Sequence, residues 1–373
     1  MDINILEEYI KTLGDVLNGG SLIISPSDAP IEEERKADLD QALDDRNFKG
    51  RDNICICLEN QLEDNNGKKD ISRISYNQRL KYFLDGSLRT KYLGEYIKGV
   101  NNFPILASQV ASSIVKREER GLYLEKLLNR LVFIFPHKET GLITDTLFDQ
   151  LEKLNEDFSK EDSLFCIEFL KAKPERDVRY SMLGKARDVM HNLEYEAANK
   201  VKRDENNWLV IDGALRKEEF ERLEYTIGLA KSFSRKPSFR LDNKILNIVE
   251  YLSSIKEGER TAVFKTQRGE GICFWYIRLR TYPPIEPLNG LVKVDYVHSS
   301  DEFTEEDIQL IDELSAEIYS LRDPSVYPYP RWPSFIYPIR FAEEYMHSVF
   351  INHEIIGYYG NKLAKMIQGG QLT

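Results

Sequence analysis

Cysteine is scarce in this sequence, and its few copies are not arranged for metal or disulfide chemistry. Four cysteines occur among the 373 residues, at Cys55, Cys57, Cys166 and Cys273, and no Cys-x-x-Cys pair is present. Structural zinc sites and disulfide-stapled domains depend on paired or regularly spaced cysteines, so both classes are disfavoured. Most of the four lie in apolar, strand-like runs, and we therefore expect buried, reduced thiols.

Long apolar runs and an excess of positive charge are also missing. No run approaches the roughly 18 apolar residues of a membrane helix. The first residues are acidic, whereas a secretory or mitochondrial leader is basic, so we expect a cytoplasmic protein with no membrane partner. Lys and Arg number 51 against 62 Asp and Glu, a formal net charge of −11. Because this charge repels a polyanion, binding to nucleic acid would require a local basic groove.

The apolar residues that are present predict a mixed α/β fold with a sizeable core. Hydrophobic residues make up 42% of the chain, which excludes a disordered protein. Short runs rich in aromatic and β-branched residues predict strands, at 82–84, 103–115, 131–135, 164–170, 208–211, 261–266, 272–279 and 291–297. Helical stretches alternate with them, at 1–18, 122–131, 181–202, 217–229 and 304–321. The last begins with Thr304-Glu-Glu-Asp307, which resembles a capping box.

Two apolar runs end in the same way, in an aspartate followed by glycine. They read Tyr82-Phe-Leu-Asp85-Gly-Ser-Leu and Trp208-Leu-Val-Ile-Asp212-Gly-Ala-Leu. An aspartate at the carboxyl end of a central strand projects at the rim of the sheet, and the glycine leaves room for a ligand. The alternative is that Asp-Gly is a favoured turn in both places. The repeated pattern favours one cleft shared by Asp85 and Asp212.

Paired strand-end aspartates suit Mg²⁺ or Mn²⁺, which prefer carboxylate oxygens. Two such ions can activate water for phosphodiester hydrolysis, and a third carboxylate is normally needed. Glu194 and Glu196 precede the second aspartate on a predicted helix. They lie about 200° apart around it, so only one faces the cleft, and we favour Glu194. Asp295 is a further strand carboxylate, but its alternation fits a solvent-facing position.

One basic segment, Lys231–Arg240, stands out in the acidic chain and is the candidate surface for phosphates. It holds four cations and no acid, and Phe233 and Phe239 could stack on bases. Lys231 could neutralise the scissile phosphate, and Arg278 alternates with apolar residues on a strand that could line the same groove. A solvated basic loop and an ordinary polar sheet face are the alternatives. The candidate DNA-binding residues are therefore Lys231, Arg235, Lys236, Arg240 and Arg278.

Taken in order from about residue 80 to residue 350, these motifs resemble the NurA-type nucleases. That family consists of RNase H-like, manganese-dependent DNA nucleases that partner HerA hexameric ATPases. The resemblance is carried by the following segments: Leu84-Asp85-Gly-Ser87, Leu193-Glu194, Leu209-Val-Ile-Asp212-Gly-Ala-Leu215, Ile227-Gly-Leu-Ala-Lys231, Trp275-Tyr-Ile-Arg278, and a Tyr-Pro segment followed by a helix near the C-terminus.

The resemblance implies an RNase H-like mixed sheet with flanking helices and helical additions. Residues 76–350 would form the nuclease domain, 1–75 an N-terminal helical extension and 351–373 a tail helix. Asp85, Glu194 and Asp212 would hold Mn²⁺ or Mg²⁺, with a histidine after Tyr-Pro as a fourth ligand. A strict register places Tyr345 at that position, so His347, Glu344 and Glu343 are all candidates, with His347 preferred. Catalytic roles would then fall to Asp85, Glu194, Asp212, Lys231 and His347.

The leading hypothesis is a DNA nuclease that acts by a two-metal mechanism. By the resemblance it would be a homodimer docked on a HerA-like hexameric ATPase, in DNA end processing or antiviral defence. The rival hypothesis is a catalytically inactive adaptor of such an ATPase, which binds DNA without cutting it; the irregular histidine register favours it. A phosphatase or nucleotide hydrolase ranks last, because no Gly-x-x-x-x-Gly-Lys-Ser/Thr phosphate loop is present.

Overall fold

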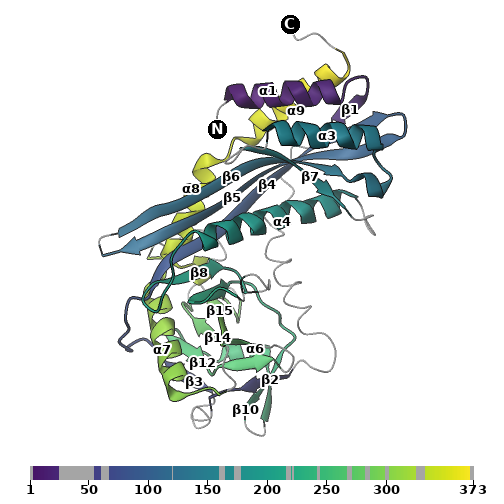
Figure 1. Cartoon of the computed structure of the whole chain (residues 1–373). Coiled ribbons are helices and arrows are strands. Elements are labelled where there is room, and N and C mark those ends of the chain that lie inside the picture. Colours follow the sequence, from purple (N-terminus) through teal and green to yellow (C-terminus); the bar gives the residue numbers. More distant parts are fainter. Residues whose placement is uncertain are drawn as a thin grey trace.

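The chain forms one large mixed sheet with helices packed on it (Figure 1). The structure, a computed structural model, describes residues 3–24, 54–59, 67–119, 121–158, 164–171, 178–215, 220, 222–241, 244–266, 271–281, 286–298, 302–324 and 332–369. No helix within these ranges combines the length and the apolar character needed to cross a membrane.

The described part of the sheet has fifteen strands. They are β1 (Ser21–Ile24), β2 (Ile54–Cys57), β3 (Lys68–Asp70), β4 (Leu80–Lys98), β5 (Asn101–Glu118), β6 (Gly121–Pro136), β7 (Phe165–Leu170), β8 (Trp208–Asp212), β9 (Thr226–Ala230), β10 (Ser238–Leu241), β11 (Lys244–Asn247), β12 (Glu259–Thr261), β13 (Phe264–Thr266), β14 (Ile272–Arg278) and β15 (Leu291–Val297). Their order is β11-β10-β2-β13-β14-β15-β9-β8-β4-β5-β6-β7, with β1 on β4, and β12 on β14 and β3.

The sheet is mixed, and its parallel pairs include the strands that carry the two candidate aspartates. β4 pairs with β8 and β8 with β9 in parallel, as do β6 with β7 and β10 with β2. The remaining strand pairs are antiparallel, among them the long β4-β5-β6 meander. The helices are α1 (Ile3–Val16), α3 (Asp145–Phe158), α4 (Val178–Asn199), α6 (Ile248–Ser253), α7 (Glu305–Ser320), α8 (Tyr337–Val349) and α9 (His353–Ile367), with 3-10 turns η2 (Lys138–Thr140) and η3 (Trp332–Ser334).

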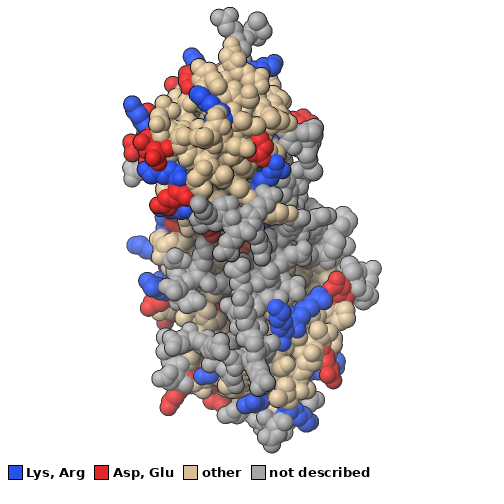
Figure 2. All heavy atoms as spheres, turned by 90° about the vertical axis from the view of Figure 1, so that its right-hand side faces the viewer, with Lys and Arg blue, Asp and Glu red and all other residues tan. Residues whose placement is uncertain are grey.

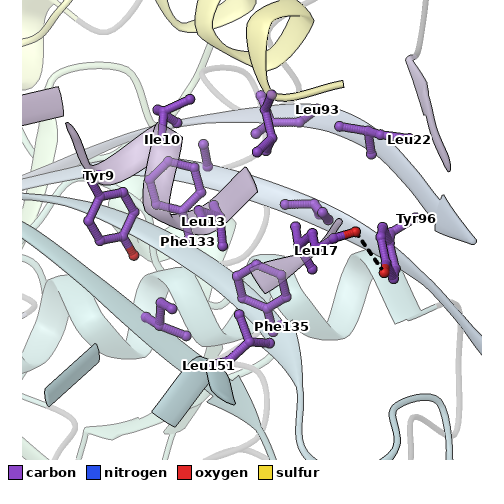
Figure 3. Packing of buried hydrophobic residues seen from close by; sticks show 14 of the residues in the cluster. Tyr9, Ile10, Leu13, Leu17, Leu22, Leu93, Tyr96, Phe133, Phe135 and Leu151 are labelled. Atoms are coloured by element: carbon purple, nitrogen blue, oxygen red, sulfur yellow. Dashed lines mark hydrogen bonds between the residues drawn. The ribbon is translucent and has the colours of Figure 1, made fainter. Parts of the chain in front are cut away.

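The long strands are covered on both faces, which explains the continuous apolar character of β5. Its residues are buried from Phe103 to Val115, without alternation. On one face α1, α3 and α9 enclose an aromatic core, in which the Tyr9 ring stacks on Phe133 at 5.2 Å between centroids (Figure 3). On the other face α4 packs against Leu106 and Val110. A strand sandwiched in this way buries both of its side-chain rows.

The second half of the sheet packs against α7 and the start of α8. Its core contains Trp275, Val294 and Leu314, all fully buried. A buried ion network joins α7 to the sheet, because Arg260 donates to Glu59 at 2.7 Å and to Asp312 at 2.8 Å. Glu59 is the second residue after the end of β2, and β2 lies between β10 and β13 in the sheet. Residues 54–59 of the N-terminal segment are therefore an integral part of the sheet.

Several sequence predictions of secondary structure are confirmed. The helices at 1–18, 181–202 and 304–321 correspond to α1, α4 and α7. The capping box of α7 is present, with Thr304 and Asp307 bonding reciprocally. The strands expected at 103–115, 208–211, 272–279 and 291–297 are also found, as β5, β8, β14 and β15. All four cysteines are free, and Cys55 and Cys273 are buried.

One predicted helix is wrong, and a second, of which residues 217–219 and 221 lie outside the described ranges, is wrong over its last residues. Residues 122–131 belong to β6, because pairing with β5 along nearly its whole length overrides the helix-like spacing of its leucines. In the stretch 217–229, residues from Thr226 onward form β9. β9 lies between β8 and β15 and is buried at every position, and the spacing of apolar residues does not distinguish such a strand from a buried helix.

Candidate active site

Asp85 and Asp212 lie side by side at one level of the sheet. Leu84 of β4 and Ile211 of β8 are register partners in the parallel pair, and one residue further along each strand come Asp85 and Asp212. Paired residues of neighbouring strands project on the same face of a sheet. The fold therefore brings two aspartates that are far apart in the sequence to adjacent positions on one face.

Helix α8 covers the face that carries Asp85. The antiparallel register pairs Asp85 with Ser113 of β5, and the Ser113 hydroxyl donates to the carbonyl of Ala342 in α8 at 2.8 Å. Asp85 is only 3% exposed, and its Oδ1 accepts a hydrogen bond from the Gly86 N–H at 2.8 Å. This carboxylate is thus buried under α8, and the backbone N–H of the next residue fixes its orientation.

Asp212 forms an ion pair with Lys231, the residue that directly follows β9. The Lys231 Nζ lies 2.9 Å from the Asp212 carboxylate, and the two side chains are 7% and 13% exposed. The same ammonium lies 4.1 Å from the ring centroid of Phe335. Lys231, which the sequence analysis considered for neutralising the scissile phosphate, therefore lies against one of the two aspartates.

The structure distinguishes between Glu194 and Glu196 on α4. Glu194 is 4% exposed and faces the sheet. Glu196 is about one-third exposed and accepts from Lys200 at 2.7 Å and Arg130 at 3.2 Å. The hydrogen bond from Lys200 is the largest influence that lowers the Glu196 pKa. Glu194 is therefore the glutamate that approaches the strand with Asp85.

Glu194 reaches β4 at Gly86, from the face opposite to α8. A Cβ at Gly86 would lie only 2.2 Å from the Glu194 Oε1, so the glutamate occupies the space that a larger residue would fill. Its Oε2 is hydrogen-bonded to the His191 Nδ1 at 2.7 Å. The sequence reasoning missed His191, although its spacing of three residues from Glu194 on a predicted helix was a visible signal.

The structure does not bring His347 to the aspartates. α8 lies on the face of Asp85, but its buried residues include Ile339, Ala342 and Met346, while the His347 side chain is 39% exposed. The His347 Nε2 lies 3.9 Å from Glu343. Glu344, the other alternative, is bound by Arg340 at 3.0 Å. Of the three residues considered as a fourth ligand, His347, Glu344 and Glu343, none is buried beside Asp85.

The candidate DNA-binding residues divide into exposed and buried groups. Arg278 is 4% exposed and donates to three backbone carbonyls, of Asn289, Leu252 and Pro287, so it is a structural residue. Phe233 and Phe239 lie in the core at 7% and 0% exposure, which contradicts a role in base stacking. Arg235, Lys236 and Arg240 are exposed, and Arg235 pairs with Glu286 at 3.0 Å.

The charged residues of the surface and the carboxylate of Asp295 also contribute to the electrostatics. Figure 2 shows acidic and basic side chains interspersed on the described surface of the face that it presents. Asp295, expected at a solvent-facing position, is instead 3% exposed. It pairs with Lys293 at 3.1 Å and accepts a hydrogen bond from the backbone of Leu215 at 3.2 Å. The expectation failed because both faces of β15 are covered over most of its length.

The donor atoms of the site are of the type that binds hard divalent cations. Asp85, Asp212 and Glu194 offer carboxylate oxygens, which Mg²⁺ and Mn²⁺ prefer. The missing side chain of Gly86 leaves the space beside β4 that Glu194 occupies. Over the described ranges, no three side chains of His, Cys, Asp or Glu lie close enough together to hold one ion. Two carboxylates, Asp85 and Asp212, thus lie on one face of the sheet, Glu194 lies on the other, and Lys231 supplies positive charge at Asp212.

Comparisons with known proteins give distant structural likenesses and no sequence match. No family model matches the chain, and no curated protein matches it. Among solved structures, the chain is similar to the crystal structure of the NurA nuclease from Sulfolobus solfataricus. The alignment covers 89% of this chain and 96% of that one, with 13% sequence identity and a TM-score of 0.35. Values this low do not assign the chain to a family.

Proposed function

We propose that the chain is a metal-dependent DNA nuclease with an RNase H-like core. The observation that carries the proposal is the parallel register of Leu84 and Ile211, which sets Asp85 and Asp212 next to each other on one face. If the two Asp-Gly sequences were only favoured turns, nothing would require the two aspartates to be neighbours. Both are largely buried, and buried carboxylates persist where they bind cations or form ion pairs.

In the proposed reaction, water is added across a phosphodiester bond. The water oxygen bonds to phosphorus, the bond from phosphorus to the leaving sugar oxygen breaks, and a proton ends on that oxygen. Bound Mn²⁺ or Mg²⁺ would supply Lewis acidity and lower the pKa of water. Asp85 and Asp212, which lie on one face of the sheet, would hold the cation, and Glu194 approaches β4 from the other face. Lys231 would place its ammonium near the phosphate, where negative charge develops in the transition state.

The proposed substrate and partners do not follow from the geometry of the site. DNA as the substrate, a homodimer and a HerA-like ATPase come from the sequence resemblance alone and remain predictions. Because the net charge of −11 repels DNA, contact with the backbone would fall to local cations. Arg235, Lys236 and Arg240 are exposed and close in sequence to Lys231, so they are our candidates for that contact. Arg278 is left out because of its burial.

The test compares matched carboxylate variants on DNA. We expect purified protein with Mn²⁺ or Mg²⁺ to degrade linear or plasmid DNA, and EDTA to stop the reaction. Asp85→Asn and Asp212→Asn should each lower the rate at least about a hundredfold, as for loss of a group that stabilises the transition state. Asp188→Asn, on the exposed side of α4, is the control and should cut like wild type. Thermal unfolding establishes that each variant is folded.

Three outcomes separate the rival hypotheses. Equal activity of wild type and both site variants would exclude these aspartates from catalysis. Intact DNA under all conditions, with and without a partner ATPase, combined with DNA binding in a mobility shift, would replace the nuclease by an adaptor. Hydrolysis of p-nitrophenyl phosphate without cleavage of DNA would indicate a phosphatase.

A further inference from the structure

Four neighbouring strands at one end of the sheet carry positive charge and no acid. They lie side by side in the order β11-β10-β2-β13, and their sequences contain Arg240, Lys244 and Lys265 but neither aspartate nor glutamate. The chain as a whole has 62 acids against 51 cations. The charge of this part of the sheet is therefore opposite in sign to the charge of the whole protein.

Two of the three cations share one face of the sheet. Arg240 of β10 pairs with Ile56 of β2 in parallel register, and Ile56 pairs with Lys265 of β13 in antiparallel register. Because direct partners on neighbouring strands point to the same face, the three side chains form a row across the sheet. Neighbouring strands are about 4.8 Å apart, so the backbones of Arg240 and Lys265 are separated by roughly 9.6 Å.

The row lies at the surface, whereas the opposite face of the same strands is core. Arg240 and Lys265 are exposed, and Ile56 between them is half-buried. Phe239 and Phe264, each one residue away from a cation, are fully buried in the apolar core that contains α6. The strands thus bury one row of side chains and present the other row, with its two cations, to solvent.

This surface row is on the face of the sheet that carries the two candidate aspartates. Lys265 pairs with Cys273 of β14, and Cys273 lies in the core beneath α7 together with Leu229 of β9. Leu229 is in turn the register partner of Asp212. Four strand spacings, roughly 19 Å, separate β13 from β8. About six nucleotides of one DNA strand span that distance, at about 3.4 Å per nucleotide.

We propose that the face of β10, β2 and β13 that carries Arg240 and Lys265 binds the phosphate backbone of the DNA substrate. This inference rests on the proposed function, and it assigns the local positive surface that a chain with a net charge of −11 needs for DNA. Cations roughly 9.6 Å apart match phosphates about three nucleotides apart along one strand. Contacts of this kind add affinity and register without sequence preference.

The experiment measures how the affinity of the full chain for DNA depends on salt. A labelled duplex of about 20 base pairs is titrated by fluorescence anisotropy in EDTA, over a series of NaCl concentrations, because each phosphate contact adds about 0.9 to the slope of log K against log salt. We expect Lys265→Gln and Arg240→Gln each to reduce the magnitude of that slope by about 0.9, on duplexes of unrelated sequence. Thermal unfolding establishes that the variants are folded.

Lys244→Gln is the matched control. Lys244 is an exposed cation on the adjacent strand, but its register partner Leu241 is buried, so it belongs to the opposite face. The variant loses the same single charge as the other two, and its slope should equal that of wild type. An equal fall for Lys244→Gln would show an effect of net charge alone and would overturn the inference.

The remaining outcomes separate this surface from the proposed function. Wild-type slopes for both Lys265→Gln and Arg240→Gln would overturn the inference and leave the nuclease proposal standing. Unchanged DNA binding combined with lost binding to poly-L-glutamate would assign the face to an acidic protein instead. A reduced slope in a protein that cuts no DNA would support the surface and remove the nuclease. If wild type binds no DNA at any salt concentration, both fail.

Discussion

Lys231 and Asp212 form an ion pair of 2.9 Å that is almost entirely shielded from water. The lysine also lies over the ring of Phe335, so its ammonium is held from two sides. An ammonium in this position neutralises Asp212, and in the proposed function it would turn to the phosphate once a cation binds that carboxylate.

Replacing Lys231 tests this role. Lys231→Met keeps the length of the side chain and removes the charge, and we expect the rate of DNA cleavage to fall about a hundredfold, as for loss of one electrostatic donor to the transition state. Lys231→Arg retains the charge and should keep more of the rate than Lys231→Met. Steady-state kinetics with saturating Mn²⁺ give the comparison; equal rates for the two variants would show that the charge is not needed.

Gly86 is expected to be intolerant of any side chain. Gly86→Ala would place a methyl group against the Glu194 carboxylate, since its Cβ would lie 2.2 Å from Oε1. The glutamate must move, and cleavage should fall about ten- to a hundredfold. Gly184→Ala in α4 is the control, because nothing lies within 4 Å of its Cβ. There the change should stabilise the helix by up to about 1 kcal/mol. Full activity of Gly86→Ala would show that the position of Glu194 is unimportant.

The buried arginine of the sheet and an exposed one should differ widely in their effect on stability. Arg260 is fully buried and paired with Glu59 and Asp312, so Arg260→Met leaves buried carboxylates without their cation and should cost about 3–5 kcal/mol. Arg235 pairs with Glu286 at the surface, and Arg235→Met should cost less than about 1 kcal/mol. Urea denaturation measures both. Similar losses for the two variants would contradict the importance of the buried network.

Two buried tyrosines of one core make a second matched pair. The Tyr9 hydroxyl has no partner among the described residues, whereas the Tyr96 hydroxyl donates to the carbonyl of Leu17 at 3.1 Å (Figure 3). Tyr96→Phe should therefore cost about 1 kcal/mol, and Tyr9→Phe should be neutral or stabilising. The free energy of unfolding from chemical denaturation decides the matter; a larger loss for Tyr9→Phe would show that its hydroxyl is satisfied.

Cys166 should resist alkylation in the folded protein. Burial is the main cause that raises the pKa of its thiol to about 12. Because only the thiolate is nucleophilic, and a raised pKa keeps the thiol protonated, almost no thiolate exists at pH 8. Iodoacetamide at that pH should label Cys166 only after unfolding in urea, as followed by peptide mass spectrometry. Rapid labelling of the native protein would contradict the raised pKa of this thiol.

The sequence patterns predicted several helices and strands and singled out a small group of candidate carboxylates. The repeated Asp-Gly ending of two apolar runs indicated that Asp85 and Asp212 share a cleft, and the parallel register is consistent with that expectation. Helical geometry predicted that only one of Glu194 and Glu196 faces the cleft, and the burial of Glu194 agrees with the preference for it. The expectation that each aspartate ends a strand holds for Asp212, the last residue of β8, and is wrong for Asp85, because β4 continues to Lys98 in pairing with β5.

The errors arose where tertiary contacts override local patterns. The leucine spacing of residues 122–131 resembles a helix, yet β5 imposes an extended conformation on it. Arg278 alternates like a residue on a polar face, but its guanidinium is enclosed by three carbonyls from other segments. His191 was overlooked because a lone histidine on a helix gains meaning only from the buried carboxylate beside it.

The position of β2 has a consequence for how the chain reaches this fold. This strand leaves the ribosome early, but both of its neighbours in the sheet, β10 and β13, begin only at Ser238 and Phe264. Until they are synthesised, the Cys55 side chain has no core to enter and Glu59 no arginine to bind. Closure of this edge is therefore a late, long-range event, and a chain stalled before Ser238 would expose an unpaired β2 to aggregation.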